Sequence, residues 1–206
     1  MINYLQFHEK MHPYGCFNVQ QVKIAFPDFD RTNYTRWVKQ RLLLRLRQEW
    51  YTFPDMLKEP DFARFVAERI YRPSYISLHS ALSFYGMIPE SVVRITSVST
   101  LKTVSFENEF GQYSYQSVKP SCFFGYEPRQ TLSGRSFMLA HPEKALLDLL
   151  YLYPQYNTED EIEELRLDED YMTNDLNIER LEEYQVRIGS KALDARVKLL
   201  RKYFEI

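Results

Sequence analysis

Residues 30–51 read DRTNYTRWVKQRLLLRLRQEWY, and this stretch sets the expected fold of the first part of the chain. After the opening aspartate, six cations come before the next acid, Glu49. Tyr34, Trp37 and Val38 recur at the three- and four-residue spacing that places side chains on one face of a helix. The first half of the stretch therefore predicts a helix whose apolar face packs inward and whose opposite face is polar and basic.

The second half of the stretch predicts a β-hairpin. Strand patterns over residues 42–46 and 50–53 flank a short tip. Because successive side chains of a strand point to opposite faces, the leucines are expected on one side, with Arg45 and Arg47 on the other. The hairpin is therefore expected to carry cations on its outward edge.

The segments before this stretch complete a small domain. Residues 2–11 predict a short helix that ends before Pro13, and a brief extended step follows it. Asn18 is a favourable N-cap for a helix over residues 19–25. Together with the basic helix and the hairpin, this is the element order of a winged helix-turn-helix DNA-binding domain, which we place over residues 1–56.

The rest of the chain predicts an α+β domain. A helix within residues 57–72 is expected to act as a linker, and Ser77 is expected to cap the helix after it. Strand patterns then cover residues 94–100, 103–107, 110–118, 121–126 and 135–140, and helices cover residues 78–85, residues from 142 onward, and residues 191–204. The expected fold class is α+β, with the N-terminal winged helix-turn-helix followed by a mixed α/β C-terminal domain over residues 73–206. That domain is expected to have an antiparallel sheet and flanking helices.

Charge is unevenly distributed along a chain whose formal net charge is −2. Residues 23–51 hold seven cations and three acids, whereas residues 158–183 hold twelve acids and two arginines. Such asymmetry indicates a basic end that binds a partner and an acidic end. The acidic stretch predicts one or two exposed helices. These form either a solvated face or a surface that docks on a basic partner or competes with DNA.

Composition also limits the cellular setting. Cys16 and Cys122 show no zinc-type spacing and are interpreted as buried free thiols. The N-terminus has no signal-peptide pattern, and no run of about 20 apolar residues occurs. The expected location is the cytoplasm, without membrane contact.

The basic helix and hairpin predict contacts with double-stranded DNA. A helix in the major groove reaches base edges with short polar side chains or arginine near its N-terminus. We expect base-edge contacts from Thr32, Asn33 and Arg36. Contacts with phosphates or the minor groove are expected from the surrounding cations, namely Arg31, Lys39 and Arg41 beside the helix and Arg45 and Arg47 on the wing.

No catalytic, cofactor-binding or metal-binding residues are expected. The chain has no glycine-rich phosphate-binding loop. The histidines are interpreted as structural or surface residues without partners at metal spacing: His8, His12, His79 and His141. One alternative is a metal-dependent nuclease, based on a weak carboxylate–lysine pattern of Glu107, Glu143, Lys144 and Asp148. Another is a protein-interaction module whose basic N-terminal domain docks on an acidic partner.

Five segments in a fixed order carry a family resemblance. They are residues 17–53, which contain the run FPDFDRTNYTRWVKQRLLLRLRQEWYTF at 26–53, then PSYISLHSALSFYGMIPE at 73–90, RITSVST at 94–100, GQYSYQSVKPSCFFGYE at 111–127 and HPEKALLDLLYLYP at 141–154. The chain resembles the AbiEi-type antitoxin family of type IV toxin–antitoxin systems. Members of this family are described as transcriptional regulators linked to abortive infection, a defence against phage.

The resemblance implies a non-enzymatic regulator with two activities. An N-terminal winged helix would bind and repress the operon's own promoter. A C-terminal domain would oppose a nucleotidyltransferase-like toxin without forming a stable complex with it. By position, the family's DNA contacts correspond to Thr32, Asn33, Arg36 and Lys39 on the helix and to Arg45 and Arg47 on the wing. The sequence departs from the family at the wing tip, where the usual glycine is replaced by the run RQEW at 47–50.

Overall fold

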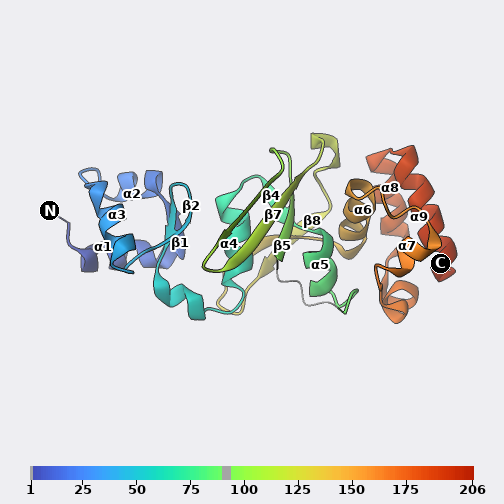
Figure 1. The fold of residues 1–206 in the computed structure, drawn as a ribbon, viewed down its shortest axis with the longest axis horizontal. Coiled ribbons are helices and arrows are strands. Elements are labelled where there is room, and N and C mark those ends of the chain that lie inside the picture. The colour runs from blue at the N-terminus through green and yellow to red at the C-terminus, as the bar shows by residue number, and fades with distance from the viewer. Residues whose placement is uncertain (1, 90–93) are drawn as a thin grey trace.

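The computed structural model describes residues 2–89 and 94–206, and the molecule is elongated (Figure 1). An N-terminal unit lies at one end, a larger sheet with helices on its faces lies in the middle, and a helical layer lies at the other end. The expected α+β class is confirmed. Within the described residues the smaller sheet is antiparallel and the larger one is mixed.

The N-terminal unit contains short helices and a three-stranded sheet. In chain order its elements are α1 (Tyr4–Met11), the 3₁₀ helix η1 (His12–Tyr14), β1 (Cys16–Asn18), α2 (Val19–Ala25), α3 (Thr32–Lys39), β2 (Leu44–Arg47) and β3 (Trp50–Thr52). β3 pairs antiparallel with both neighbours, in the order β1-β3-β2. The expected N-cap is confirmed, because the Asn18 side chain accepts hydrogen bonds from the N–H groups of Gln20 and Gln21 at 3.0 and 2.9 Å.

An aromatic core holds α3 against this sheet. The centroid of the Phe7 ring on α1 lies 4.8 Å from that of Trp37 and 5.6 Å from that of Phe17 on β1. Tyr34 stacks on Tyr51 of β3, with ring centroids 4.7 Å apart. Each buried aromatic pair adds about 0.5–1.5 kcal/mol beyond the burial of its area. Because Tyr34 and Trp37 are buried as expected, the opposite face of α3 is directed to solvent.

The middle of the molecule is a six-stranded sheet of order β6-β7-β5-β4-β9-β8. Its strands are β4 (Ser74–Ile76), β5 (Arg94–Ser99), β6 (Val104–Asn108), β7 (Gly111–Ser117), β8 (Tyr126–Gln130) and β9 (Ser136–Ala140). The expectation of an antiparallel sheet is wrong here, because β4 runs parallel to β9 and β5 runs parallel to β7. The hairpins β6–β7 and β8–β9 are local and antiparallel, and the parallel pairs arise where non-consecutive strands meet.

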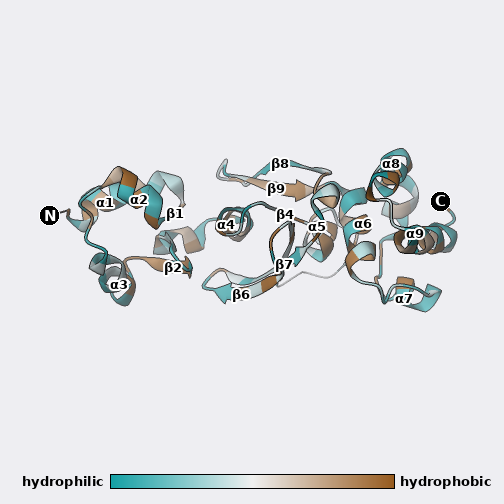
Figure 2. Ribbon diagram, turned by 90° about the horizontal axis from the view of Figure 1, so that it is seen from above, coloured by the Kyte–Doolittle hydropathy of each residue, from teal (hydrophilic) through white to brown (hydrophobic). Residues whose placement is uncertain are grey.

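Helices cover both faces of this sheet (Figure 2). α4 (Phe62–Ile70) lies between the N-terminal unit and the sheet, and α5 (Leu78–Phe84) and α6 (Pro142–Leu152) lie on the opposite face. The outer layer contains α7 (Glu159–Glu163), the π-helical turn η4 (Tyr171–Asp175), α8 (Ile178–Ile188) and α9 (Lys191–Phe204). Of these, α8 and α9 pack on α6. Among the helices of the described residues, none has the length and apolar character needed to span a bilayer.

Residues 57–72 are more than a linker. They begin within the 3₁₀ helix η2 (Pro54–Lys58) and contain α4, whose Phe62, Phe65 and Val66 are buried in the same core as the large sheet. Leu46 of the β2–β3 hairpin joins this core too. The N-terminal unit is therefore packed against the rest of the molecule.

Two local expectations are wrong. Residues 121–126 do not form a strand, because Pro120 starts the 3₁₀ helix η3 (Pro120–Cys122) and Gly125 turns the chain with φ of 72° before β8 begins. The Ser77 side chain does not cap α5, since its hydroxyl donates instead to the Asp148 carboxylate at 2.8 Å. The first departure follows from Pro120 and Gly125 in the local sequence, and the second from a contact with Asp148, 71 residues away.

Candidate nucleic-acid interface

The solvent-facing side of α3 carries polar and basic residues. Thr32, Arg36 and Lys39 are exposed, as expected from the sequence. Thr35 lies on the same side, although it was not among the expected contact residues. Its spacing of three residues after Thr32 and four before Lys39 is the signal that places it there. The face therefore presents two hydroxyls, a guanidinium and an ammonium group.

Asn33 does not belong to this face. Only 6 % of its surface is exposed, so the expectation that it reads base edges is wrong. Asn33 precedes the buried Trp37 by four residues, and side chains at that spacing lie on the same side of a helix. The helical period therefore turns Asn33 toward the core, even though its neighbour Thr32 faces solvent.

The start of α3 carries charges of both signs. The Asp30 carboxylate accepts a hydrogen bond from the Thr32 N–H at 2.9 Å, which lowers the pKa of Asp30 and keeps it ionised. Arg31 occupies the N-cap position and lies 3.9 Å from the Glu49 carboxylate of the hairpin. Such an exposed pair contributes at most about 1 kcal/mol, so Arg31 can exchange Glu49 for a phosphate at little cost.

The two arginines of the hairpin have different surroundings, although the alternation of strand side chains places both on the outward edge. Arg45 is exposed, as expected. Arg47 instead turns inward, where its guanidinium lies over the Tyr71 and Phe106 rings at 4.7 and 4.9 Å and donates to the Ile70 carbonyl at 3.2 Å. A register shift between Arg45 and Arg47 accompanies this turn. The expected contact of Arg47 with DNA would therefore require its guanidinium to leave the Tyr71 and Phe106 rings.

Arg41 also has a partner in the second half of the chain. It follows α3 with a left-handed φ of 58°, and its guanidinium forms an ion pair with Glu109 at the β6–β7 turn. The expectation that Arg41 lies on phosphate therefore competes with this ion pair. Because both side chains are largely exposed, the pair is weak, and it can open when a phosphate approaches.

The tip of the hairpin forms without the glycine that the family resemblance leads one to expect. Glu49 takes the left-handed conformation there, with φ of 63°. Its carbonyl accepts a hydrogen bond from the Val19 N–H at 3.1 Å, which ties the tip to the start of α2. The tip is therefore anchored, but the exposed Glu49 carboxylate opposes the approach of a phosphate.

The four residues of the weak nuclease pattern do not come together at one site. Lys144 and Asp148 are buried in a network with Tyr75 and Ser77 on the covered face of the sheet. Glu143 is also buried, and it accepts a hydrogen bond from the Asn177 N–H at 3.0 Å at the start of α8. Glu107 is exposed on β6. Among the described residues, none of these carboxylates belongs to a group that could hold a metal ion.

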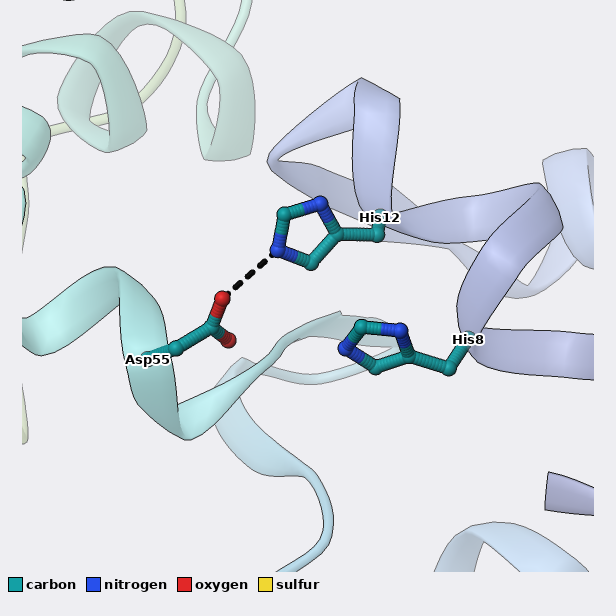
Figure 3. A group of neighbouring side chains, drawn as sticks. All are labelled: His8, His12 and Asp55. Atoms are coloured by element: carbon teal, nitrogen blue, oxygen red, sulfur yellow. Dashed lines mark hydrogen bonds and ion pairs between the residues drawn. The ribbon is translucent and has the colours of Figure 1, made fainter. Parts of the chain in front are cut away.

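One group of metal-ligand type does form, and sequence reasoning missed it (Figure 3). His8 on α1, His12 on η1 and Asp55 on η2 have potential ligand atoms that all lie within 4.8 Å of one another. His12 Nε2 and Asp55 Oδ2 are 2.6 Å apart. The four-residue spacing of the two histidines was a usable signal, because it places both on one side of a helix. Asp55 had no such signal, since it is 43 residues away from His12.

The exposed cations at and around α3 thus include Arg31, Arg36 and Lys39 at the helix, Arg41 directly after it and Arg45 on the hairpin. Compared with models of known protein families the chain matches none, and no curated protein matches it.

Proposed function

We propose that the chain is a sequence-specific DNA-binding autorepressor and antitoxin of a type IV toxin–antitoxin system in phage defence. The observation that carries the DNA-binding part is the exposed polar and basic face of α3, presented by a helix whose other face is locked into an aromatic core. The order α1-β1-α2-α3-β2-β3 supports the expected winged helix-turn-helix, in which α3 would be the helix that enters the major groove.

The chemistry of the face assigns different roles to its residues. Arg36 has the planar fork that pairs with the O6 and N7 acceptors of guanine, and Thr32 and Thr35 are short enough to approach base edges. Lys39, Arg31 and Arg45 surround this face with positive charges that suit phosphates. Recognition then combines a few base contacts from α3 with positioning by the surrounding cations.

The antitoxin part of the proposal rests on the resemblance to AbiEi-type proteins. In this proposal the C-terminal domain opposes a nucleotidyltransferase-like toxin in the cytoplasm without a stable complex and without catalysis of its own. The opposite charges of the two ends support separate sites for the two activities, because the acidic residues 158–183 are unsuited to binding DNA. Repression would belong to the N-terminal unit, and toxin neutralisation to the sheet and the helical layer.

Replacing Arg36 with alanine is expected to weaken binding to the chain's own upstream DNA by about 1–3 kcal/mol and to relax base preference at one position. The reason is the loss of a bidentate base contact. Fluorescence anisotropy with labelled upstream DNA and single-base variants measures both effects. Binding to a shuffled duplex should change much less, and equal losses on both duplexes would contradict a base-reading role.

Replacing Lys39 with alanine is expected to weaken binding to upstream and shuffled DNA by similar factors. One phosphate contact fewer should also reduce the slope of log K against log salt by about 0.9. Lys198→Ala is the matched control, because Lys198 is exposed on α9, far along the chain from the basic face. If Lys39→Ala and Lys198→Ala behave alike, α3 is not the DNA-binding helix.

A cellular assay separates the two proposed activities. Arg36→Ala should release a reporter driven by the upstream region, yet it should still protect cells that express the neighbouring toxin. Parent protein that binds upstream and shuffled DNA equally would argue against repression and for the docking of an acidic partner. Parent protein that represses but fails to protect would remove the antitoxin role alone.

A further inference from the structure

A histidine–histidine–aspartate group lies where the first helix meets the segment that leaves the hairpin. His8 lies on α1 and His12 begins η1, one helical turn later. Asp55 lies in the first turn of η2, directly after β3 and Phe53. Figure 3 shows both imidazole rings extending toward the Asp55 carboxylate. We propose that His8, His12 and Asp55 bind one divalent transition-metal ion of the zinc class.

The aromatic core places these side chains in advance. The centroid of the buried Phe53 ring lies 4.4 Å from that of His8 and 5.7 Å from that of His12, and the two imidazoles are 4.7 Å apart. The centroid of the Tyr4 ring lies 5.8 Å from that of His8. Since packing already orients the rings, little side-chain entropy is lost when an ion binds.

The types of ligand select the class of metal. Imidazole nitrogens suit zinc, cobalt, nickel and copper, whereas Mg²⁺ and Ca²⁺ favour sites made of oxygen atoms. In a tetrahedral site with bonds of 2.0–2.2 Å, neighbouring ligand atoms lie about 3.4 Å apart. The largest separation here, at most 4.8 Å, therefore needs to close by up to about 1.4 Å, and the 2.6 Å between His12 Nε2 and Asp55 Oδ2 needs to open by about 0.8 Å. Small rotations of the partly exposed side chains can supply both changes.

The site is open enough for an ion to enter and to keep a water ligand. The side chains of His12 and Asp55 are 36 % and 53 % exposed. The ion would replace the hydrogen bond of 2.6 Å that joins His12 Nε2 to Asp55 Oδ2. It would thereby tie α1 to η2, the segment through which the chain passes from the hairpin to α4. Metal binding would then stabilise the N-terminal unit, because the unfolded chain lacks the preformed site.

The test uses the full chain without a histidine tag, titrated with Co²⁺ and followed by visible absorption. We expect one equivalent of Co²⁺ to bind with the strong visible bands of a low-coordinate site, and Zn²⁺ to displace it. His8→Gln and Asp55→Asn should each weaken binding at least about tenfold, since even outer-shell partners are worth about 10–100-fold. Glu9→Gln is the matched control, because Glu9 is an exposed acid between the two histidines.

Thermal unfolding provides a second readout. Zn²⁺ should raise the Tm of the parent and of Glu9→Gln, and it should leave His8→Gln and Asp55→Asn unchanged. The proposal is overturned if Co²⁺ binds only at millimolar concentration, or if the two ligand variants bind it as the parent does. Loss of binding in Glu9→Gln would point instead to nonspecific attraction by surface acids. Far-UV circular dichroism of each metal-free variant verifies that it folds, and DNA binding does not enter this test.

Discussion

Replacing Asp148 with alanine is expected to lower the free energy of unfolding by about 3–5 kcal/mol, which is the cost of leaving a buried charge without its partner. Lys144 is fully buried on α6, and its ammonium group pairs with the Asp148 carboxylate one helical turn later. Without Asp148 the ammonium group would keep the Tyr75 hydroxyl, at 2.9 Å, as its remaining polar partner in this network. Urea denaturation followed by fluorescence measures the loss.

The network around Asp148 explains why the loss should be large. The Tyr75 and Ser77 hydroxyls both donate to Asp148 Oδ2, at 2.9 and 2.8 Å. Burial, and then the nearby Asp148 carboxylate, raise the pKa of Tyr75 well above its ordinary value, so its hydroxyl keeps the proton it donates. Removing the carboxylate therefore leaves two hydroxyls and one ammonium group short of partners in the interior.

Two controls separate loss of charge pairing from loss of packing. The double variant Lys144→Met/Asp148→Leu removes both charges and should recover most of the stability, because apolar replacements of buried ion pairs are often neutral or stabilising. Glu107→Ala removes an exposed carboxylate and should change stability by about 0.5 kcal/mol or less. If the double variant is as unstable as Asp148→Ala, the ion pair is not the source of the loss.

Local signals in the sequence are sufficient to predict most of the helices and strands of the N-terminal unit. Asn18 caps α2 because its side chain bonds to N–H groups of the next turn, which needs no other part of the chain. Tyr34 and Trp37 face the core because the helical period puts them together. The same period places Asn33 on the side of Trp37, four residues later, so its polar character alone does not put it on the outer face.

The remaining differences come from contacts between distant segments. Arg47 was expected to face outward by strand alternation, but the aromatic rings of Tyr71 and Phe106 and a register shift draw it inward. The parallel pairing of β5 with β7 could not be derived from hairpin patterns, because it joins strands that are not consecutive in the chain. The expected DNA-contact residues nevertheless include those that the structure exposes on α3, apart from Thr35.

Substitution of Arg47 tests how the β2–β3 hairpin is joined to the large sheet. Replacing it with alanine is expected to cost about 2–4 kcal/mol, from one charged hydrogen bond and two cation–π contacts. Its neighbour Leu46 also accepts a hydrogen bond from Asn108 of β6, at 3.1 Å. The hairpin is therefore held by the large sheet as well as by its own unit, and its direction relative to α3 depends on both.

Arg45→Ala is the matched control for this substitution, because Arg45 lies on the same strand and is exposed. Arg45→Ala should change stability by about 0.5 kcal/mol or less, yet it should reduce the salt dependence of DNA binding by about one phosphate contact. Arg47→Ala should behave in the opposite way, with lower stability and an unchanged salt slope. Urea denaturation and salt titrations of DNA affinity measure the two quantities on the same proteins. A lower salt slope for Arg47→Ala without loss of stability would show that Arg47 leaves its aromatic contacts to bind DNA. In that case the interface between the hairpin and the large sheet would have to open when DNA binds.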